Sequence, residues 1–184
     1  MIHRAVATIL ALGLVVACTS APTSEPQTSP PPAEQTAEDA QFRLTIRMAS
    51  SVQRAGEPID LETTLAYLGP DIAVIVGSDW SPPVWFELEH LDGDLDLDGP
   101  VSLLTCNLTP IDAGVPLTIP FIKNGGYSGD DPDAAYWKTF FDDPALRLPA
   151  GRWRLSSNFQ GVTSDRCEGA MHRLRASITF DVVP

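Results

Sequence analysis

Apolar residues recur at every second position in short runs from residue 42 onward, and turn-forming residues separate these runs. A period of two is typical of strands that bury one face and expose the other. The first run would bury the side chains of Phe42, Leu44, Ile46 and Met48. Six further runs cover residues 59–67, 72–76, 84–91, 115–121, 152–159 and 174–182. About seven strands with regular turns predict an all-β fold, a sandwich of two sheets.

One segment has helical character. Asp130-Asp131-Pro132-Asp133 supplies acceptors for free backbone amides and a proline that suits a first helical turn. The run 134–141 follows, and Asp143-Pro144 would end it. The sequence therefore predicts one short helix, within the long excursion between the fifth and sixth strands.

The N-terminus resembles the signal peptide of a bacterial lipoprotein. A basic start (His3, Arg4) precedes an apolar run, and Val15-Val16-Ala17-Cys18 is similar to a lipobox. The apolar run of thirteen residues is too short to span about 30 Å of hydrocarbon. The resemblance implies removal of residues 1–17, lipid on Cys18 and an extracytoplasmic protein anchored to the cell membrane. The alternative is an ordinary secretory signal that leaves Cys18 as a free thiol.

Residues 18–40 are expected to form a linker. Residues 19–40 contain five prolines and seven serines or threonines, with no aromatic residue. Such a segment buries too little apolar surface to offset its chain entropy, so we predict that it is disordered. The remaining residues, 41–184, suffice for one domain with its own core.

The charge of the chain restricts its partners. It carries 24 acidic and 12 basic side chains, and loss of Arg4 with the signal peptide leaves a net charge of −13. This surface repels phosphate backbones and anionic headgroups. We therefore expect no nucleic-acid partner, and contact with the membrane only through the covalent lipid.

Two cysteines remain once Cys18 carries lipid. Cys106 and Cys167 both fall in predicted loops, and an exported chain meets oxidising surroundings. The two thiols allow one disulfide; the alternative is a pair of buried, unpaired cysteines.

Several strand entries carry a family resemblance. Ala55-Gly56-Glu57-Pro58, Gly69-Pro70 and Pro149-Ala150-Gly151-Arg152-Trp153-Arg154-Leu155 resemble bacterial immunoglobulin-like modules of surface proteins. The resemblance covers most of residues 41–184 and implies an immunoglobulin-like sandwich. The tryptophan of antibody-type domains is missing from residues 72–78, so only the architecture carries over.

An aspartate run is a weak candidate for calcium. Asp94, Asp96 and Asp98 precede Gly99, as in the start of a calcium loop, but the twelfth position is Thr105 instead of a bidentate glutamate. Because leucines alternate with the aspartates, the run also fits a strand with a solvated acidic face. We expect no metal.

Aromatic residues offer a candidate ligand surface. Trp80, Trp85, Tyr127, Tyr136 and Trp137 can stack against the C–H face of a sugar ring. The alternative is that they fill the core beneath the long excursion before residue 152.

Catalytic signatures are missing from the sequence. The mature chain has two histidines, His90 and His172, and it contains no Gly-x-Ser-x-Gly elbow and no His or Cys metal spacing. We expect no enzyme and no cofactor. The leading hypothesis is a lipid-anchored binding or accessory module of the cell envelope, whose partner is a protein or a glycan. The alternatives are a carbohydrate-binding lipoprotein and an inhibitor or chaperone-like domain that acts through loops or a strand edge.

The anchor hypothesis has a direct test. Cys18→Ser removes the thiol that receives the lipid, so the variant is expected to leave the membrane fraction for the soluble fraction on cell fractionation. Equal membrane association of the variant and the parent chain would contradict the anchor.

Overall fold

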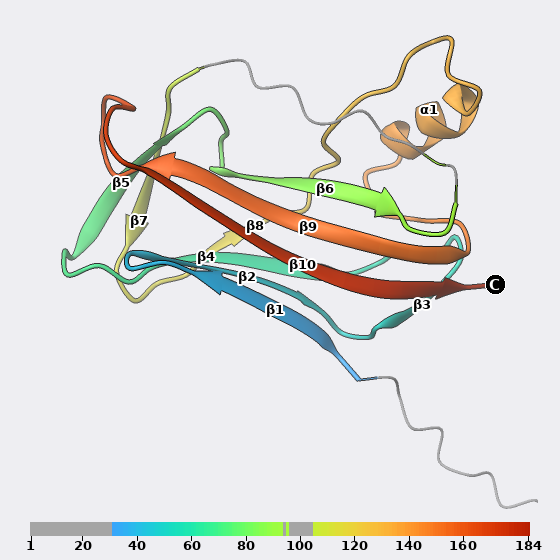
Figure 1. The fold of residues 1–184 in the computed structure, drawn as a ribbon, viewed down its shortest axis with the longest axis horizontal. Helices are drawn as coiled ribbons and strands as arrows, with labels where there is room; N and C mark the ends of the chain where they lie inside the picture. The colour runs from blue at the N-terminus through green and yellow to red at the C-terminus, as the bar shows by residue number, and fades with distance from the viewer. Residues whose placement is uncertain (1–30, 94, 96–104) are drawn as a thin grey trace, which may run out of the picture.

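A computed structural model describes residues 31–93, 95 and 105–184. Two β-sheets pack face to face along one long axis, and the single short helix of the described residues lies beside them (Figure 1). The all-β two-sheet sandwich predicted from the sequence is therefore confirmed. The signal peptide, Cys18 and the candidate calcium residues Asp94, Asp96 and Asp98 lie outside the described residues.

The smaller sheet has the strand order β1-β2-β4-β8, and its pairings are antiparallel. Its strands are β1 (Ala33–Glu38), β2 (Phe42–Met48), β4 (Leu61–Tyr67) and β8 (Leu117–Ile119). The alternation of β2 is as predicted, because Phe42, Leu44, Ile46 and Met48 are all buried while the residues between them are exposed or partly exposed.

The larger sheet has the order β3-β10-β9-β5-β7, and β6 also pairs with β9. Its strands are β3 (Val52–Arg54), β5 (Ala73–Ser78), β6 (Val84–His90), β7 (Asn107–Asp112), β9 (Gly151–Val162) and β10 (Met171–Val183). Its longest ladder joins β9 and β10 over twelve residue pairs, from Gly151–Val182 to Val162–Met171. The predicted alternation of β10 is confirmed: every second residue from Leu174 to Val182 is buried.

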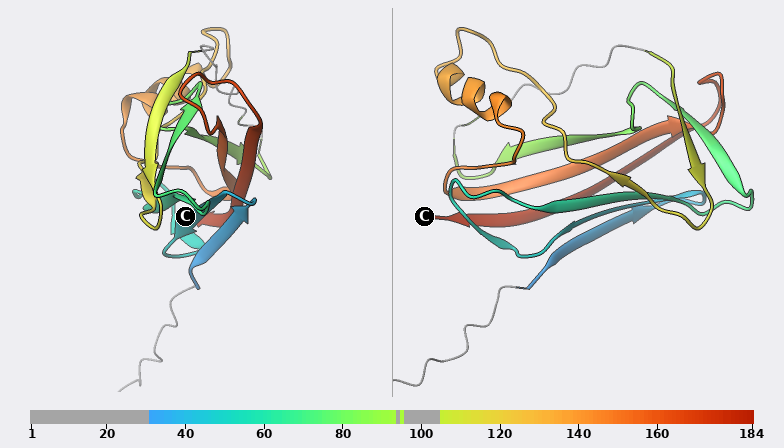
Figure 2. Two further views of the ribbon diagram at one scale, coloured as in Figure 1. Left: turned by 90° about the vertical axis from the view of Figure 1, so that its left-hand side faces the viewer. Right: turned by 180° about the vertical axis from the view of Figure 1, so that it is seen from behind.

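The predicted helix forms as α1 (Ala134–Asp142) and ends at Asp143. Its residues Trp137 and Phe140 are buried, and Phe140 borders a small space with Phe86 and Leu88 of β6. Figure 2 shows α1 beside β6, on the side of the molecule away from β1. The capping differs from the expectation, since the N-cap Asp133 makes no side-chain capping bond and Asp131 Oδ1 accepts the Asp133 N–H instead.

The prediction of a disordered linker through residue 40 is wrong for residues 33–38. These residues form β1, which pairs with β2 along its whole length, and Ala33 and Ala37 pack against the core. Backbone hydrogen bonding to β2 does not depend on side-chain composition, so a polar, proline-flanked segment can still join the sheet. The folded domain therefore begins before residue 41.

The strand predictions also missed β3 and β7. β3 has three residues, and β7 contains Pro110 and buries only Ile111, so neither shows a clear period of two. The described residues contain ten strands instead of about seven. The third predicted run was misplaced at its start, because Ile72 lies outside β5 and is 91% exposed.

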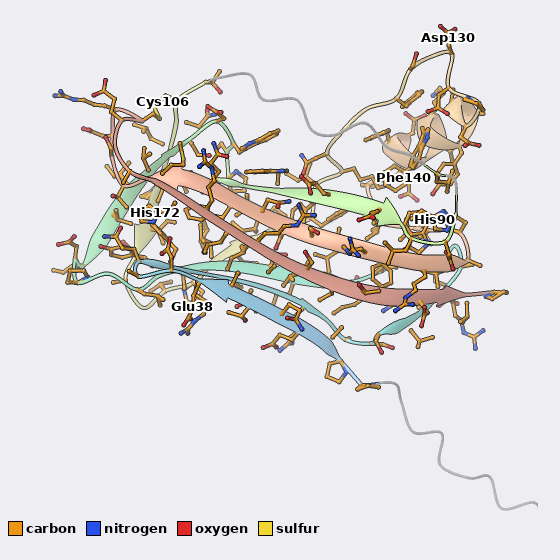
Figure 3. All side chains as sticks on the ribbon, in the orientation of Figure 1. Glu38, His90, Cys106, Asp130, Phe140 and His172 are labelled. Atoms are coloured by element: carbon orange, nitrogen blue, oxygen red, sulfur yellow. A yellow bond between two sulfur atoms is a disulfide. The ribbon has the colours of Figure 1, made fainter. Side chains whose placement is uncertain are left out.

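The predicted disulfide is present. Cys106 precedes β7, and Cys167 lies in the turn between β9 and β10, with the two Cα atoms 5.8 Å apart (Figure 3). The bridge packs over β5: a Cβ on Gly77 would lie 2.6 Å from the Cys167 Sγ and 2.8 Å from the Ser164 carbonyl oxygen. Only glycine fits at residue 77 without moving the bridge.

Removal of the bridge tests its contribution to stability. Cys106→Ser combined with Cys167→Ser opens a loop with a sequence separation of 61 residues. The expected loss in the free energy of unfolding is about 4 kcal/mol, because the unfolded chain regains that loop entropy. Denaturant unfolding measures this loss. If the parent chain unfolds at the same denaturant midpoint with and without reductant, the bridge does not stabilise the fold as expected.

Truncation tests the corrected domain boundary. A chain that begins at residue 41 lacks β1 and exposes the edge of β2, so we expect it to lose on the order of 2 kcal/mol of stability and to aggregate more readily. The matched control is a chain that begins at residue 31. Equal denaturant midpoints for the two chains would show that β1 does not belong to the folded domain.

Candidate ligand-binding site

The structure divides the predicted aromatic surface into two parts. Trp80 and Trp85 are partly exposed and stack on each other, with ring centroids 5.5 Å apart and an interplanar angle of 26°. Tyr136 and Trp137 lie on α1, where Trp137 is only 1% exposed and fills the core. Tyr127 stacks on Phe141 with centroids 5.9 Å apart. The predicted surface is therefore not continuous, and Trp80 and Trp85 form its partly exposed stacked pair.

The alternation of β6 places Trp85 on the outer face of the larger sheet. Val84 and Phe86 on either side of it are buried, and Trp85 pairs in register with Asn158 of β9. Asn158 pairs in turn with Arg175 of β10. Residues opposite one another in a sheet share a face, so these three side chains form one row across three strands.

The loop that carries Trp80 is tied to the same strand. The backbone N–H of Trp80 donates to the Ser78 hydroxyl oxygen at 3.1 Å, and that hydroxyl donates to the Gln160 carbonyl oxygen at 2.8 Å. These bonds fix the start of the connection between β5 and β6 against β9. The position of Trp80 beside Trp85 therefore follows from tertiary hydrogen bonds.

A groove of about 210 Å³ runs beside the tryptophan pair. We call it the Trp85 groove; its lining residues are Trp85, Asn158, Phe159, Gln160, Arg173, Leu174 and Arg175. It combines two aromatic residues, Trp85 and Phe159, with amide and guanidinium groups. This mixture of apolar wall and few polar groups is typical of ligand sites.

The Trp85 groove is locally cationic in an acidic protein. Arg175 pairs with Glu87 at 2.9 Å and donates to the Ser156 hydroxyl oxygen at 3.1 Å. Arg173 is exposed and forms no ion pair with any residue of the described ranges. Because no described residue engages its guanidinium in an ion pair, Arg173 is the groove residue best placed to meet an acceptor on a ligand.

Asn158 carries an unsatisfied polar group in this groove. The residue is 6% exposed, and its Nδ2 has no hydrogen-bond partner among the described residues. An unpaired buried amide costs about 1–3 kcal/mol, and native structures retain few such groups. The Nδ2 atom exposes almost no surface, so an acceptor on a ligand in the groove would reach it only after a small movement of the side chains around it.

The two histidines occupy separate structural settings. His90 stacks on Trp153 with centroids 4.2 Å apart, and His172 Nδ1 lies 2.8 Å from Asp39 Oδ2. Burial opposes ionisation of Asp39, but the N–H of Gln41 and the His172 side chain outweigh burial and lower the pKa of the Asp39 carboxyl. Among the described residues, no group of three or more His, Cys, Asp or Glu side chains is arranged to hold a metal ion.

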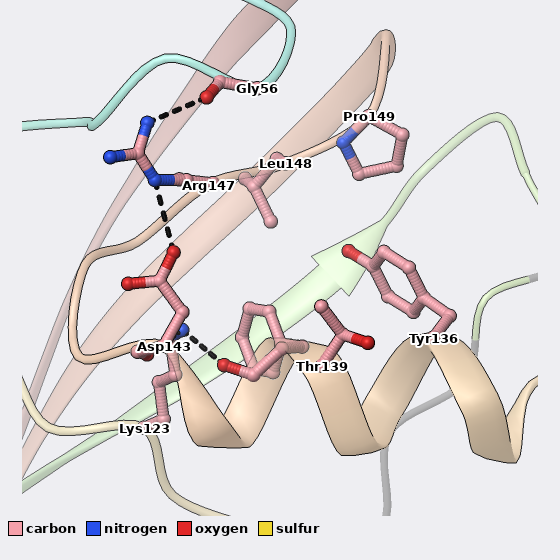
Figure 4. Close-up of a pocket in the computed structure, with 9 residues that line it drawn as sticks. Gly56, Lys123, Tyr136, Thr139, Asp143, Arg147, Leu148 and Pro149 are labelled. Atoms are coloured by element: carbon pink, nitrogen blue, oxygen red, sulfur yellow. Dashed lines mark hydrogen bonds and ion pairs between the residues drawn. The ribbon is translucent and has the colours of Figure 1, made fainter.

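Sequence reasoning missed a second cavity, which we call the α1 pocket. It has a volume of about 290 Å³ and lies between α1, the segment after it and the turn after β3 (Figure 4). Its lining residues are Gly56, Lys123, Tyr136, Thr139, Phe140, Asp143, Arg147, Leu148 and Pro149. No sequence motif predicts this pocket, because its lining residues come from segments up to 93 positions apart that only the fold brings together.

Lys123 and Asp143 form the charged end of the α1 pocket. The Lys123 ammonium donates to the carbonyl oxygens of Phe140 and Asp143 at the end of α1 and lies 4.1 Å above the Phe140 ring centroid. Burial lowers the pKa of Lys123. The N–H of Ala145, together with Arg147 and Lys123, lowers the pKa of the Asp143 carboxyl against the effect of its burial.

Comparisons of the chain with protein-family models, with curated proteins and with solved structures found no match. Within the described ranges, no helix has the length and apolar character needed to cross a membrane. The functional argument therefore depends on the geometry of the two cavities.

Proposed function

We propose that this chain is a non-catalytic binding module of the cell envelope, held at the membrane by lipid on Cys18, and that the Trp85 groove is its ligand site. The observation that carries the proposal is the partly exposed ring of Trp85, stacked on Trp80, in a groove that also contains Asn158, whose Nδ2 has no partner among the described residues. The resemblance to immunoglobulin-like surface modules agrees with a binding role.

A glycan is the ligand class that suits this groove best. The face of the Trp85 ring offers an apolar platform for the C–H side of a pyranose, while Asn158, Gln160 and Arg173 offer donors and acceptors for its hydroxyls. A protein partner that adds a strand has less support. The longest edge of the smaller sheet, β1, has six residues and carries the charged residues Glu34 and Glu38, and the other edges are short or blunted. β3 and β8 have three residues each, β7 carries Pro110, and the Phe86 N–H on the free side of β6 donates to Asn124 Oδ1.

The position of the groove along the sheet agrees with membrane anchoring. The Ser51 N–H donates to the Pro31 carbonyl oxygen, and the Asp181 N–H donates to the Ser51 carbonyl oxygen, so the N-terminal segment enters at the C-terminal end of β10. Arg173 lies near the other end of β10, about 26 Å away along the strand. A lipid tether would leave the domain at the end where β1 begins (Figure 1), and the groove would lie toward the other end.

The position at which β1 begins also limits the length of the tether. Fourteen residues separate Cys18 from Ala33. They can reach about 45 Å if fully extended as polyproline II, and about 20 Å as a coil. The module would therefore act close to the membrane surface, on polymers or proteins of the envelope.

Trp85→Ala tests the site. It removes the stacking face without changing any buried residue of the core, so retention on purified envelope glycan is expected to fall roughly tenfold or more, as for a central aromatic contact. Affinity electrophoresis measures this change, and Trp80→Ala should have a smaller effect in the same direction.

Tyr127→Ala is the matched control, because it removes a partly exposed aromatic ring outside the groove. If Trp85→Ala is retained on the glycan as strongly as the parent chain, the Trp85 groove is not the glycan site. If the chain retains an envelope protein but no glycan, and Trp85→Ala abolishes that retention, the groove is still the binding site but its ligand is a protein.

A further inference from the structure

We propose that the α1 pocket is a second, separate ligand site, and that it takes a small organic carboxylate with an apolar body. The inference does not rest on the glycan proposal, because the α1 pocket and the Trp85 groove share no lining residue. It rests on the apolar walls of the pocket and on the inventory of its hydrogen-bonding groups.

The walls suit an apolar body. The ring of Phe140, the side chain of Leu148 and the ring of Pro149 line the cavity, and the ring of Tyr136 adds a further aromatic surface (Figure 4). A volume of about 290 Å³ lies near the lower end for small-molecule sites, which suits a ligand of about the size of an aryl-substituted short acid.

The carboxylate of Asp143 and three carbonyl oxygens of the pocket already accept hydrogen bonds, whereas the Thr139 hydroxyl donates to the Ala135 carbonyl oxygen at 3.1 Å and its oxygen can still accept. Asp143 Oδ1 accepts the Ala145 N–H at 2.8 Å, and Asp143 Oδ2 accepts Arg147 Nε at 3.0 Å. The Gly56 carbonyl oxygen accepts Arg147 Nη1 at 2.7 Å. The carbonyl oxygens of Phe140 and Asp143 accept the Lys123 ammonium. A ligand that offers mainly donors would have to displace these bonds.

Most of the spare hydrogen-bonding capacity consists of donors. The Tyr136 hydroxyl is buried and has no partner among the described residues, and in Figure 4 it is directed toward Leu148 and Pro149. Burial raises the pKa of Tyr136 to about 12, so this hydroxyl keeps its proton at neutral pH. Lys123 has three N–H groups for two acceptors, and Arg147 retains N–H groups beyond the two in use.

The formal charge of the residues that line the pocket favours an anionic ligand. Lys123 and Arg147 face one carboxylate, Asp143, so the lining residues carry a formal charge of +1 in a chain of net charge −12. A carboxylate would neutralise that charge and supply acceptors to the Lys123 and Arg147 donors, and to Tyr136 after a small movement of its ring.

The pocket is formed before any ligand arrives. The Gly56 N–H donates to the Leu148 carbonyl oxygen at 3.0 Å, and the Ile59 N–H donates to the Leu146 carbonyl oxygen at 2.9 Å. These bonds and the Lys123 contacts hold α1, the segment after it and the turn after β3 together. Binding therefore needs little reorganisation of the backbone.

The test uses the mature chain from residue 18 with Cys18→Ser, titrated calorimetrically with 3-phenylpropanoate. The matched amide, 3-phenylpropanamide, and the matched amine, 3-phenylpropan-1-amine, have the same apolar body. The carboxylate is expected to bind at least about tenfold more tightly than the amide, and the amine is expected not to bind.

Tyr136→Phe separates binding from folding. It deletes an unsatisfied buried hydroxyl, so the melting temperature should stay the same or rise, while affinity for the carboxylate should fall about fivefold. Lys123→Met should weaken binding further and lower the melting temperature, because it removes the bonds to the end of α1. Trp85→Ala should leave carboxylate affinity unchanged.

Equal affinities for acid and amide, no binding of the acid at millimolar concentration, or undiminished binding by both Tyr136→Phe and Lys123→Met would overturn the proposal. Loss of glycan retention by Trp85→Ala with intact carboxylate binding would show that the two sites are separate. None of the carboxylate results bears on the Trp85 groove, so the two proposals can fail independently.

Discussion

The twelve-pair antiparallel ladder between β9 and β10 is the interaction on which the rest of this structure depends. β3 joins β10 on one side of it, and β5 and β6 join β9 on the other. Its inner face supplies Trp153, Leu155, Phe159, Ile178 and Phe180 to the core. Its outer face sets Asn158 beside Trp85 and Arg175. The same register therefore fixes both the packing of the sandwich and the Trp85 groove.

The sequence predicted what local patterning controls. β2 and β10 alternate strictly, and α1 is bounded by an aspartate-proline segment at each end, so their positions and buried faces could be inferred. β1 was missed because its pairing with β2 uses backbone groups within a polar segment. The groove could be anticipated only through Trp80 and Trp85. Gln160 and Arg173 join them through a ladder register that no local pattern encodes.

Each cavity contains one polar group that the fold leaves unsatisfied: Asn158 Nδ2 in the Trp85 groove and the Tyr136 hydroxyl in the α1 pocket. Each cavity also gathers arginine or lysine in a strongly acidic chain. The described residues contain five further buried side-chain atoms without a partner, so the two cavities are distinguished by their lining as a whole and not by these two atoms alone. Both features suit a module that would be kept near a membrane by lipid and would recognise ligands through small local positive fields.

The most direct measurement of the central claim follows the tryptophan indole N–H signals by NMR while envelope glycan fragments are added. The chain has four tryptophans, and Trp137 and Trp153 are each 1% exposed, so they act as internal references. Binding at the Trp85 groove predicts saturable shifts of the Trp80 and Trp85 signals, with those of Trp137 and Trp153 nearly unchanged. Saturable binding that leaves the Trp80 and Trp85 signals unmoved would contradict the claim.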